Sequence, residues 1–293
     1  MPELPEVQTT ASGLDARIRG LRIESVWTDY RSPLQRGKES IKDPAYFRRF
    51  KEAVIGRRIA SVGRKAKNVL IRLDSGDTIL VHMKMTGHLM YGDYDRSDPF
   101  NRFIHLVIGF DNGATLELSD MRKFAKVALI KEADLETSPH LERIGPDPLG
   151  RGFSLAAFKE RLALKPRMRI KQALMDQALI AGIGNIYSDE ALWRAGINPE
   201  ERVSGIPGAL MKRLFAATLE VLNEGIDFGG DSMSDYRDVD GKPGRFQDRH
   251  RAYRKTGEPC SKRGCRGIIV RAKVGGRSAH FCSSHQKLLR QAA

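Results

Sequence analysis

The apolar positions at the start of the chain repeat at the spacing of a helix. They fall three or four residues apart, at Leu4, Val7, Ala11, Leu14 and Ile18. A proline is tolerated in the first turn of a helix, and acidic side chains there interact favourably with the positive end of the helix dipole. The pattern therefore predicts a short amphipathic helix at the N-terminus.

The following hundred residues carry the shorter apolar runs of β-strands. Strands are predicted over residues 22–28, 68–73, 78–83, 104–110, 114–118 and 124–130. Turn sequences separate two pairs of these strands, and one of the turns contains Asn112-Gly113, a strong hairpin signal. The first half is thus expected to be an antiparallel sandwich or barrel that carries the N-terminal helix.

Prolines, glycines and acidic residues gather over 132–152, and helical periodicity dominates after them. Helices are predicted over 155–164, 170–180, 186–195 and 207–225. We therefore expect an α+β fold with domain 1–133, a linker at 134–152, a helical domain at 153–244 and a C-terminal module at 245–293. The polar stretch 231–244 shows no clear period, and it is either an ordered functional loop or a mobile one.

The three cysteines all lie near the C-terminus and form part of a metal-ligand pattern. Cys260, Cys265, Cys282 and His285 are arranged as C-x4-C-x16-C-x2-H, close to the spacing of structural zinc sites. Strands predicted over 268–274 and 278–281 would form a β-hairpin between the ligand pairs. The alternative is three buried thiols and a surface histidine. His280 is a competing ligand, but the spacing of Cys282 and His285 favours His285.

The net charge of the chain indicates which class of partner it binds. Fifty Lys and Arg against 36 Asp and Glu give a net charge of +14. Residues 242–293 hold fourteen Lys or Arg and two Asp or Glu, so the excess is concentrated at the C-terminus. Such a surface favours nucleic acid as the partner. The acidic N-terminus does not resemble a secretory signal, and the uncharged stretch 177–188 is too short to span a bilayer. We expect a cytoplasmic protein that is not membrane-bound.

Two further segments have both a structural and a functional interpretation. Gly182, Gly184 and Asn185 lie between predicted helices, where they form either a simple turn with an N-cap or a phosphate site at a helix N-terminus. Pro2 permits removal of Met1, which would leave a free secondary amine that can attack an aldehyde-like carbon. On its own, a Met-Pro start usually has no function.

Taken together, these motifs are specific. The run from Pro2 to Val7, the Gly182–Asn185 loop and a four-ligand finger, in this order, resemble the formamidopyrimidine-DNA glycosylase/endonuclease VIII family over essentially the whole chain. Leu4 before Pro5 resembles the formamidopyrimidine branch. The resemblance implies an N-terminal β-sandwich, a helix–two-turn–helix domain and a β-hairpin zinc finger with one structural Zn²⁺. It also implies a monomer that acts on damaged double-stranded DNA near the bacterial nucleoid.

The resemblance also assigns roles to single residues. It implies that Pro2 is the nucleophile, that Glu3 is the acid/base residue at the sugar and that Lys67 contacts a phosphate beside the lesion. Met85 would fill the gap left by the extruded base, Arg122 would face the orphaned base, and Phe124 would enter the stack. Further DNA contacts are implied for Glu6, His105, Lys123, Asn185 and Arg277.

The chain departs from the family pattern at several of these positions. His285 stands where a cysteine is usual, the first ligand pair is spaced by four residues, and Met121 and Lys123 replace proline and arginine. The expected function is a bifunctional glycosylase/AP lyase that removes oxidised purines and cuts the strand by β,δ-elimination. The alternatives are an enzyme for oxidised pyrimidines and a non-catalytic zinc-finger DNA-binding protein. If the stretch 231–244 is a loop that reads the damaged base, it would favour the assignment to oxidised purines.

Overall fold

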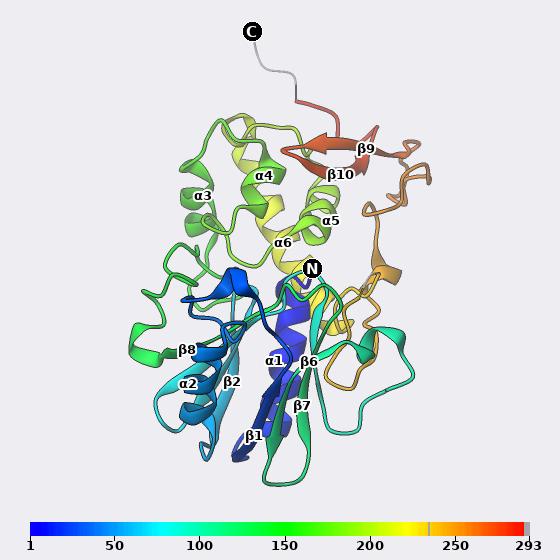
Figure 1. Cartoon of the computed structure of the whole chain (residues 1–293). Coiled ribbons are helices and arrows are strands. Elements are labelled where there is room, and N and C mark those ends of the chain that lie inside the picture. The colour runs from blue at the N-terminus through cyan, green and yellow to red at the C-terminus, as the bar shows by residue number, and fades with distance from the viewer. Residues whose placement is uncertain (234, 290–293) are drawn as a thin grey trace. The chain divides into compact units, whose positions relative to one another are not determined.

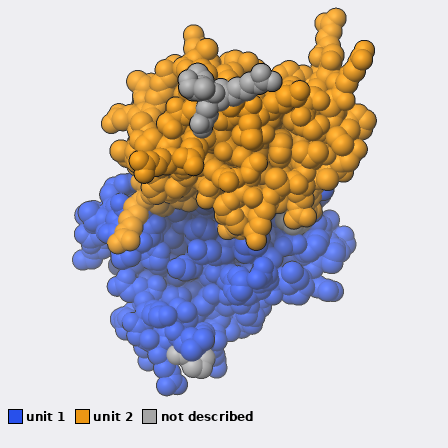
Figure 2. Space-filling view, turned by 90° about the horizontal axis from the view of Figure 1, so that it is seen from above, with its two compact units in different colours: residues 1–142, 225–247 blue, residues 143–224, 248–293 orange. Residues whose placement is uncertain are grey.

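The structure is a computed structural model that describes residues 1–233 and 235–289. Its contacts divide the chain into two compact units, 1–142 with 225–247 and 143–224 with 248–293 (Figure 2). The sequence analysis grouped residues 225–244 with the helical domain, whereas their contacts lie with the first unit. The first unit is therefore built from two separate stretches of chain.

The described residues of the first unit form two four-stranded antiparallel sheets, accompanied by the α-helices α1 and α2 (Figure 1). The strand order is β1-β6-β7-β5 in one sheet and β2-β3-β4-β8 in the other. The helices are α1 (Leu4–Ile18) and α2 (Pro44–Val54). The strands are β1 (Ile23–Thr28), β2 (Ile59–Lys65), β3 (Asn68–Leu73), β4 (Asp77–His82), β5 (Gly87–Tyr91), β6 (Ile104–Phe110), β7 (Thr115–Asp120) and β8 (Lys126–Lys131).

Both sheets and α1 share one apolar core. Leu14 of α1, Val69 of β3 and Leu118 of β7 are fully buried members of it. Alternate residues of a strand face the same side, so two sheets with apolar inner faces bury them against each other. The expected α+β fold, with a sandwich and an N-terminal helix, is confirmed.

Both predicted hairpins form, but three elements were not predicted. β3 pairs with β4 and β6 pairs with β7, each across its predicted turn. Helix α2 and strands β2 and β5 were missed. A signal for α2 was present, because Asp43 precedes Pro44 and caps the helix by accepting hydrogen bonds from the backbone N–H groups of Ala45 and Tyr46.

The second unit contains helices and one β-hairpin. These elements are α3 (Leu155–Ala163), α4 (Ile170–Met175), α5 (Asn185–Ala195), most of α6 (Gly208–Asp227), β9 (Ile269–Val274) and β10 (Arg277–Cys282). α4 is shorter than the predicted helix 170–180. Asp176 is extended and its carboxylate accepts from the N–H of Ala178, which stabilises a turn after α4.

Residues 231–244 pack onto the sandwich. The backbone N–H of Tyr91 donates to Val239 O at 2.9 Å, and the Asn101 amide donates to Gly241 O at 2.9 Å. Arg237 forms an ion pair with Asp98 at 2.7 Å. Apart from Ser234, which lies outside the described residues, this stretch is held by specific contacts. No helix in the described part of the chain combines the length and apolar character needed to cross a membrane.

Candidate active site, nucleic-acid surface and metal centre

The first residues of the chain form a capped helix start. Glu3 is the N-cap of α1, and its carboxylate accepts a hydrogen bond from the backbone N–H of Glu6. In return, Glu6 Oε2 accepts from the N–H of Glu3 at 2.6 Å. This reciprocal pair is a capping box, which fixes the direction in which the chain enters the helix. Pro2, directly before the cap, is buried and thereby held in one position.

Glu6 also ties the N-terminus to the second stretch of the first unit. Its Oε1 accepts from the backbone N–H of Asp231 at 2.7 Å, and the Tyr236 hydroxyl donates to the Glu6 carbonyl at 3.1 Å. Gly230 lies so close that an added Cβ would meet Glu6 Cγ at 2.8 Å. The start of loop 231–244 therefore lies against the residues that the sequence assigned to catalysis.

Three turns of the sandwich place the residues expected to contact DNA. Of the four non-glycine residues with positive φ in the described chain, three are Ala66, Lys84 and Lys123. They directly precede Lys67, Met85 and Phe124, respectively. A left-handed backbone is uncommon for such residues and costs free energy, and it concentrates at functional sites. Each turn thus holds its side chain in a conformation that the sequence alone does not favour.

A buried aspartate holds two of these turns together. The Thr86 hydroxyl donates to the fully buried Asp120 and accepts from the backbone N–H of Arg122 at 3.1 Å. Asp120 also accepts from the N–H of Ala125 at 2.7 Å and from the Tyr30 hydroxyl at 3.0 Å. No motif in the sequence marks Thr86 or Asp120, because their role is to position other residues.

Two large apolar side chains on these turns face solvent. Met85 is 41% exposed and Phe124 is 49% exposed, although both lie next to buried sandwich residues. The Arg122 guanidinium lies over the Phe124 ring at 4.5 Å, a cation–π contact that orients both groups. An exposed apolar and planar group beside a fixed cation suits insertion into a base stack.

Lys67 occupies the two-residue turn between β2 and β3 and is largely buried. His82, at the end of β4, is a neighbour that the sequence analysis did not single out. Burial lowers the pKa of His82 to about 3, and the charges of Lys84, Lys67 and Lys126 add to this effect. His82 Nδ1 accepts from the N–H of Lys84 at 3.0 Å, so the neutral ring carries its proton on Nε2. His82 is therefore an uncharged donor beside Lys67.

His105 and Lys123 are both attached to Asp29. His105 Nδ1 lies 2.7 Å from one carboxylate oxygen of Asp29, and Lys123 Nζ lies 3.0 Å from the other. His105 also stacks on Tyr30, with ring centroids 5.3 Å apart. The pKa of Asp29 is lowered, because hydrogen bonds and charge from Lys123 and His105 outweigh the opposing effect of burial, the largest single contribution. The cluster fixes both basic side chains at the edge of the sandwich.

In the second unit, a loop between α4 and α5 carries Asn185. The N-cap of α5 is Gly184, one residue earlier than expected, and Asn185 is the first helical residue. The Gln177 amide donates to Ile183 O at 2.8 Å, and its carbonyl accepts from the N–H of Gly182 at 2.9 Å. This side chain bridges the loop and holds its shape.

The same loop reaches the β9–β10 hairpin. Asn185 Nδ2 donates to the Ser278 hydroxyl at 3.3 Å, and Ser278 follows the exposed Arg277 at the start of β10. Asn185 is therefore hydrogen-bonded to the residue that follows Arg277 in the chain.

A buried charge network fixes the hairpin on α5. Lys171 and Asp189 are both fully buried, and Lys171 Nζ pairs with Asp189 at 2.5 Å. The second oxygen of Asp189 accepts from the backbone N–H of His280 and lies 3.0 Å from its Nδ1. His280 is therefore bound to Asp189, which agrees with the choice of His285 as the fourth ligand.

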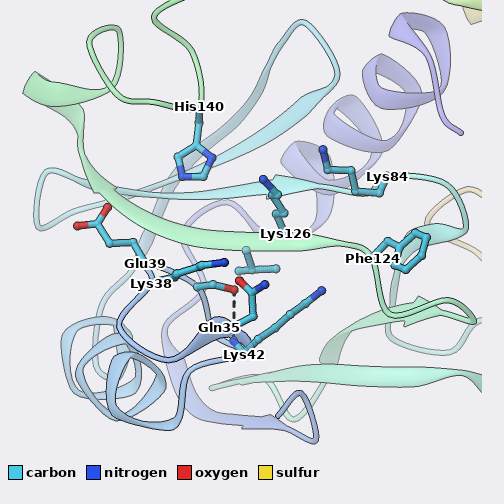
Figure 3. A pocket seen from close by; sticks show the side chains of 10 residues that line it. Gln35, Lys38, Glu39, Lys42, Lys84, Phe124, Lys126 and His140 are labelled. Atoms are coloured by element: carbon cyan, nitrogen blue, oxygen red, sulfur yellow. Dashed lines mark hydrogen bonds between the residues drawn. The ribbon is translucent and has the colours of Figure 1, made fainter. Parts of the chain in front are cut away.

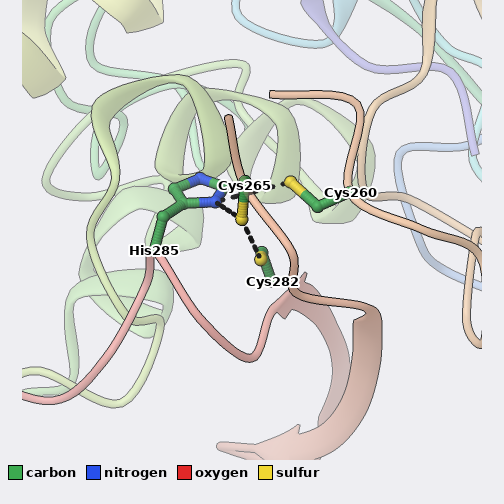
Figure 4. Close-up of side chains that lie close together, drawn as sticks. All are labelled: Cys260, Cys265, Cys282 and His285. Atoms are coloured by element: carbon green, nitrogen blue, oxygen red, sulfur yellow. Dashed lines mark hydrogen bonds between the residues drawn. The ribbon is translucent and has the colours of Figure 1, made fainter. Parts of the chain in front are cut away.

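The four expected metal ligands converge on one point (Figure 4). The ligand atoms of Cys260, Cys265, Cys282 and His285 all lie within 4.8 Å of one another. Cys265 Sγ lies 3.5 Å from Cys282 Sγ, and His285 Nδ1 lies 3.5 Å from Cys260 Sγ. Three thiols and one imidazole are a donor set that suits a tetrahedral ion.

The groups around these ligands agree with metal binding. His285 Nε2 lies 3.1 Å from the carbonyl of Trp193, which places the ring proton on Nε2 and leaves Nδ1 as the ligand atom. Burial lowers the pKa of His285, which favours the neutral, ligating form. A Cβ on Gly267 would meet Cys282 Sγ at 2.6 Å, so only glycine fits beside that thiol. The residues present therefore fit a metal ion.

Comparison with known proteins agrees with this arrangement. Residues 1–127 match the formamidopyrimidine-DNA glycosylase N-terminal domain, and residues 144–237 match the formamidopyrimidine-DNA glycosylase H2TH domain. The formamidopyrimidine-DNA glycosylase of Heliobacterium modesticaldum is 39% identical over 288 residues, covering 98% of this chain and 100% of that protein. That of Afipia carboxidovorans is 38% identical over 308 residues, with the same coverage.

Solved structures of DNA complexes have the same fold. The Lactococcus lactis enzyme bound to DNA with an abasic site is 31% identical, with a TM-score of 0.84 over 98% of this chain and 100% of that one. A complex of MutM with DNA containing carbocyclic 8-oxo-G has 31% identity and a TM-score of 0.83, with the same coverage. The chain belongs to the formamidopyrimidine-DNA glycosylase family, and it is a DNA glycosylase of DNA repair.

Proposed function

We propose that this protein is a bifunctional DNA glycosylase/AP lyase that removes oxidised purines from duplex DNA. The proposal rests mainly on the arrangement of the N-terminus. Pro2 is buried there, and it directly precedes Glu3, the N-cap of α1, which exchanges hydrogen bonds with Glu6. A protein that only binds DNA has no need of this arrangement. Relatives of this chain are complexed with abasic-site, Fapy-dG and 8-oxo-G DNA.

The chemistry starts with loss of Met1, which frees the Pro2 nitrogen. That nitrogen attacks C1′ of the damaged nucleotide, and the base leaves with the electron pair of the glycosidic bond and gains a proton. Opening of the sugar ring gives a cationic iminium between Pro2 and C1′. Its positive charge acidifies the neighbouring carbon C2′, so that loss of a C2′ proton expels the 3′ phosphate. Loss of a second proton, from C4′ of the resulting unsaturated iminium, then expels the 5′ phosphate. Glu3, next to Pro2, is the group that exchanges protons at the sugar.

Residues of both units contact the DNA. Lys67 and neutral His82 contact phosphates beside the lesion, and Asn185 and Arg277 form a second phosphate-binding pair. Met85 fills the gap left by the extruded base, Arg122 faces the orphaned base and Phe124 enters the stack, which offsets part of the cost of unstacking. Further contacts come from Glu6, His105 and Lys123. The protein acts as a monomer on DNA in the cytoplasm.

The finger is held by one structural Zn²⁺. Cys260, Cys265, Cys282 and His285 would bind it, and the ion supplies folding free energy to the hairpin and no chemistry at the sugar. The basic residues after 242 supply affinity that does not depend on sequence.

Trapping with borohydride tests the proposal. Duplex DNA with one abasic site and sodium borohydride should give a covalent adduct with the wild type. The Pro2→Leu variant keeps Met1 attached and should give none, whereas the exposed control Glu24→Gln should trap like the wild type. An undiminished adduct with Pro2→Leu would contradict the proposal. A panel of duplexes with 8-oxoguanine, formamidopyrimidine or oxidised pyrimidines then decides between purine and pyrimidine specificity.

A further inference from the structure

A cavity of about 450 Å³ lies in the first unit, between loop 35–42, the start of β8 and residue 140 (Figure 3). Its walls include Lys38, Lys42, Lys84 and Lys126, and Phe124 stands at one end. We call it the lysine pocket. Neither Pro2, Glu3 nor Lys67 lines it, so it is separate from the residues assigned to the sugar chemistry.

The charge of the lysine pocket is poorly balanced. Glu39 is its one acidic lining residue, and it is exposed. Among residues 1–233 and 235–289, no ion pair is formed by Lys38, Lys84 or Lys126. Surface lysines usually have water around them or an acidic partner, and here several share one concave site.

The lysines influence one another. The pKa of Lys84 is lowered by burial first and by the charge of Lys126 second. Burial also lowers the pKa of Lys42. The charge of Asp120 opposes this effect, and the charges of Lys126 and Lys84 add to it. Burial and the charge of Lys126 lower the pKa of His140, and the charge of Glu39 opposes this shift. A bound anion would relieve this repulsion and favour every ammonium group.

The chemistry of the lining selects the class of anion. Four lysine side chains line one concave site, where Lys42 already donates to the Lys123 carbonyl, and Gln35 and His140 add further polar groups. This combination suits a tetrahedral phosphate, which accepts hydrogen bonds from several directions. Phe124 indicates the source of the phosphate. If its ring enters the base stack, the backbone of the duplex must pass the mouth of the lysine pocket.

We propose that the lysine pocket binds a backbone phosphate of the duplex next to the base step that Phe124 enters. This inference rests on the proposed function, which supplies the DNA and the position of Phe124. The lysine pocket would extend the grip on DNA beyond the lesion and hold the backbone while Phe124 is inserted.

The test compares two double variants that remove the same charge. Lys38→Gln/Lys126→Gln alters the lysine pocket, and Lys51→Gln/Lys131→Gln removes two other exposed lysines of the same unit. Affinity for a duplex with a tetrahydrofuran abasic analogue is measured by fluorescence anisotropy over a range of salt concentrations. The pocket variant should bind about tenfold more weakly, and its salt slope should fall by about one for each lost phosphate contact. Equal slopes for the two double variants would overturn the inference.

Neutral methylphosphonates, placed one at a time along each strand, identify the phosphate. One position near the lesion should weaken binding to the wild type and leave binding to Lys38→Gln/Lys126→Gln unchanged. If no position does so while inorganic phosphate alone binds the wild type in ³¹P NMR, the pocket takes a free anion and the proposal is wrong.

The proposed function is tested separately by borohydride trapping of the wild type. If the wild type forms the adduct but the two double variants have equal salt slopes, the phosphate site in the lysine pocket is rejected and the proposed lyase activity stands. If the pocket variant has the smaller salt slope but the wild type forms no adduct, the lyase chemistry is rejected and the phosphate site stands.

Discussion

The carboxylate of Glu6 accepts a hydrogen bond from the backbone N–H of Asp231 at 2.7 Å, across 225 residues of sequence. Its other oxygen accepts from the N–H of Glu3 at 2.6 Å. One side chain therefore connects the start of the chain to loop 231–244. Both contacts are buried, and in each of them a Glu6 oxygen accepts from a backbone N–H group.

Replacing Glu6 by alanine should destabilise the protein by about 2–4 kcal/mol, because two buried N–H groups lose their acceptor. Glu6→Gln keeps one acceptor oxygen and should lose less. Denaturant unfolding followed by circular dichroism measures both, with Glu24→Ala as the exposed control. If Glu6→Ala were as stable as that control, Glu6 would not hold the loop.

Acid should destabilise the first unit through His88. This histidine is fully buried, its Nε2 lies 2.9 Å from Asn101 Oδ1, and burial lowers its pKa to about 4. The folded state therefore keeps His88 neutral, whereas the unfolded chain takes up a proton near pH 6.5. Stability should be complete above pH 6.5 and fall as the pH drops towards 4.

Glutamine can donate to Asn101 but does not titrate, so His88→Gln should flatten this part of the pH profile. The measurement is the denaturation midpoint between pH 7.5 and 4.5 for both proteins. Parallel profiles would show that other groups cause the loss of stability in acid.

The exposed Arg277 should contribute to DNA affinity through a phosphate. Arg277→Ala should weaken binding to all duplexes alike and lower the salt slope by about one. Lys159→Ala, which removes an exposed charge on α3, serves as the control. An unchanged slope in Arg277→Ala would contradict the phosphate contact.

Removal of the metal should unfold the finger and leave the sandwich folded. Purified protein should contain one zinc per chain by atomic emission, and a strong chelator should make the region after residue 248 sensitive to protease. His285→Cys should retain the ion and His285→Ala should lose it, while the exposed control Lys287→Gln should behave like the wild type. A metal-free wild type with a protease-resistant finger would exclude a structural ion.

Much of the fold could be predicted because its signals are local. The apolar spacing from Leu4 to Ile18 matches α1 residue for residue, and the Asn112-Gly113 turn connects β6 and β7 as expected. β2 was missed because its second half is Gly63-Arg64-Lys65, which lacks strand-like alternation. β5 was missed because its pattern was interpreted only as part of the motif around Met85.

The residues of the candidate site also differ in whether the sequence alone can predict them. Residues that carry a motif, such as Pro2 and the four metal ligands, can be found in the sequence because chemistry restricts their type and spacing. Asp120 and Thr86 cannot, since their roles depend on a contact between segments that are distant in sequence. His82 cannot, since its low pKa depends on burial in the folded protein. The lysine pocket likewise brings together Lys38, Lys84 and Lys126 from distant segments.

The Pro2 nitrogen should carry the bond to the sugar, and peptide mapping of the trapped complex can locate that bond. Protein reduced with borohydride on abasic-site DNA is digested with nuclease and protease, and the modified peptide is sequenced by tandem mass spectrometry. The expected product is a chain that starts at Pro2, with the remnant of the sugar on the Pro2 nitrogen. A remnant on a lysine, or on a chain that still carries Met1, would contradict it.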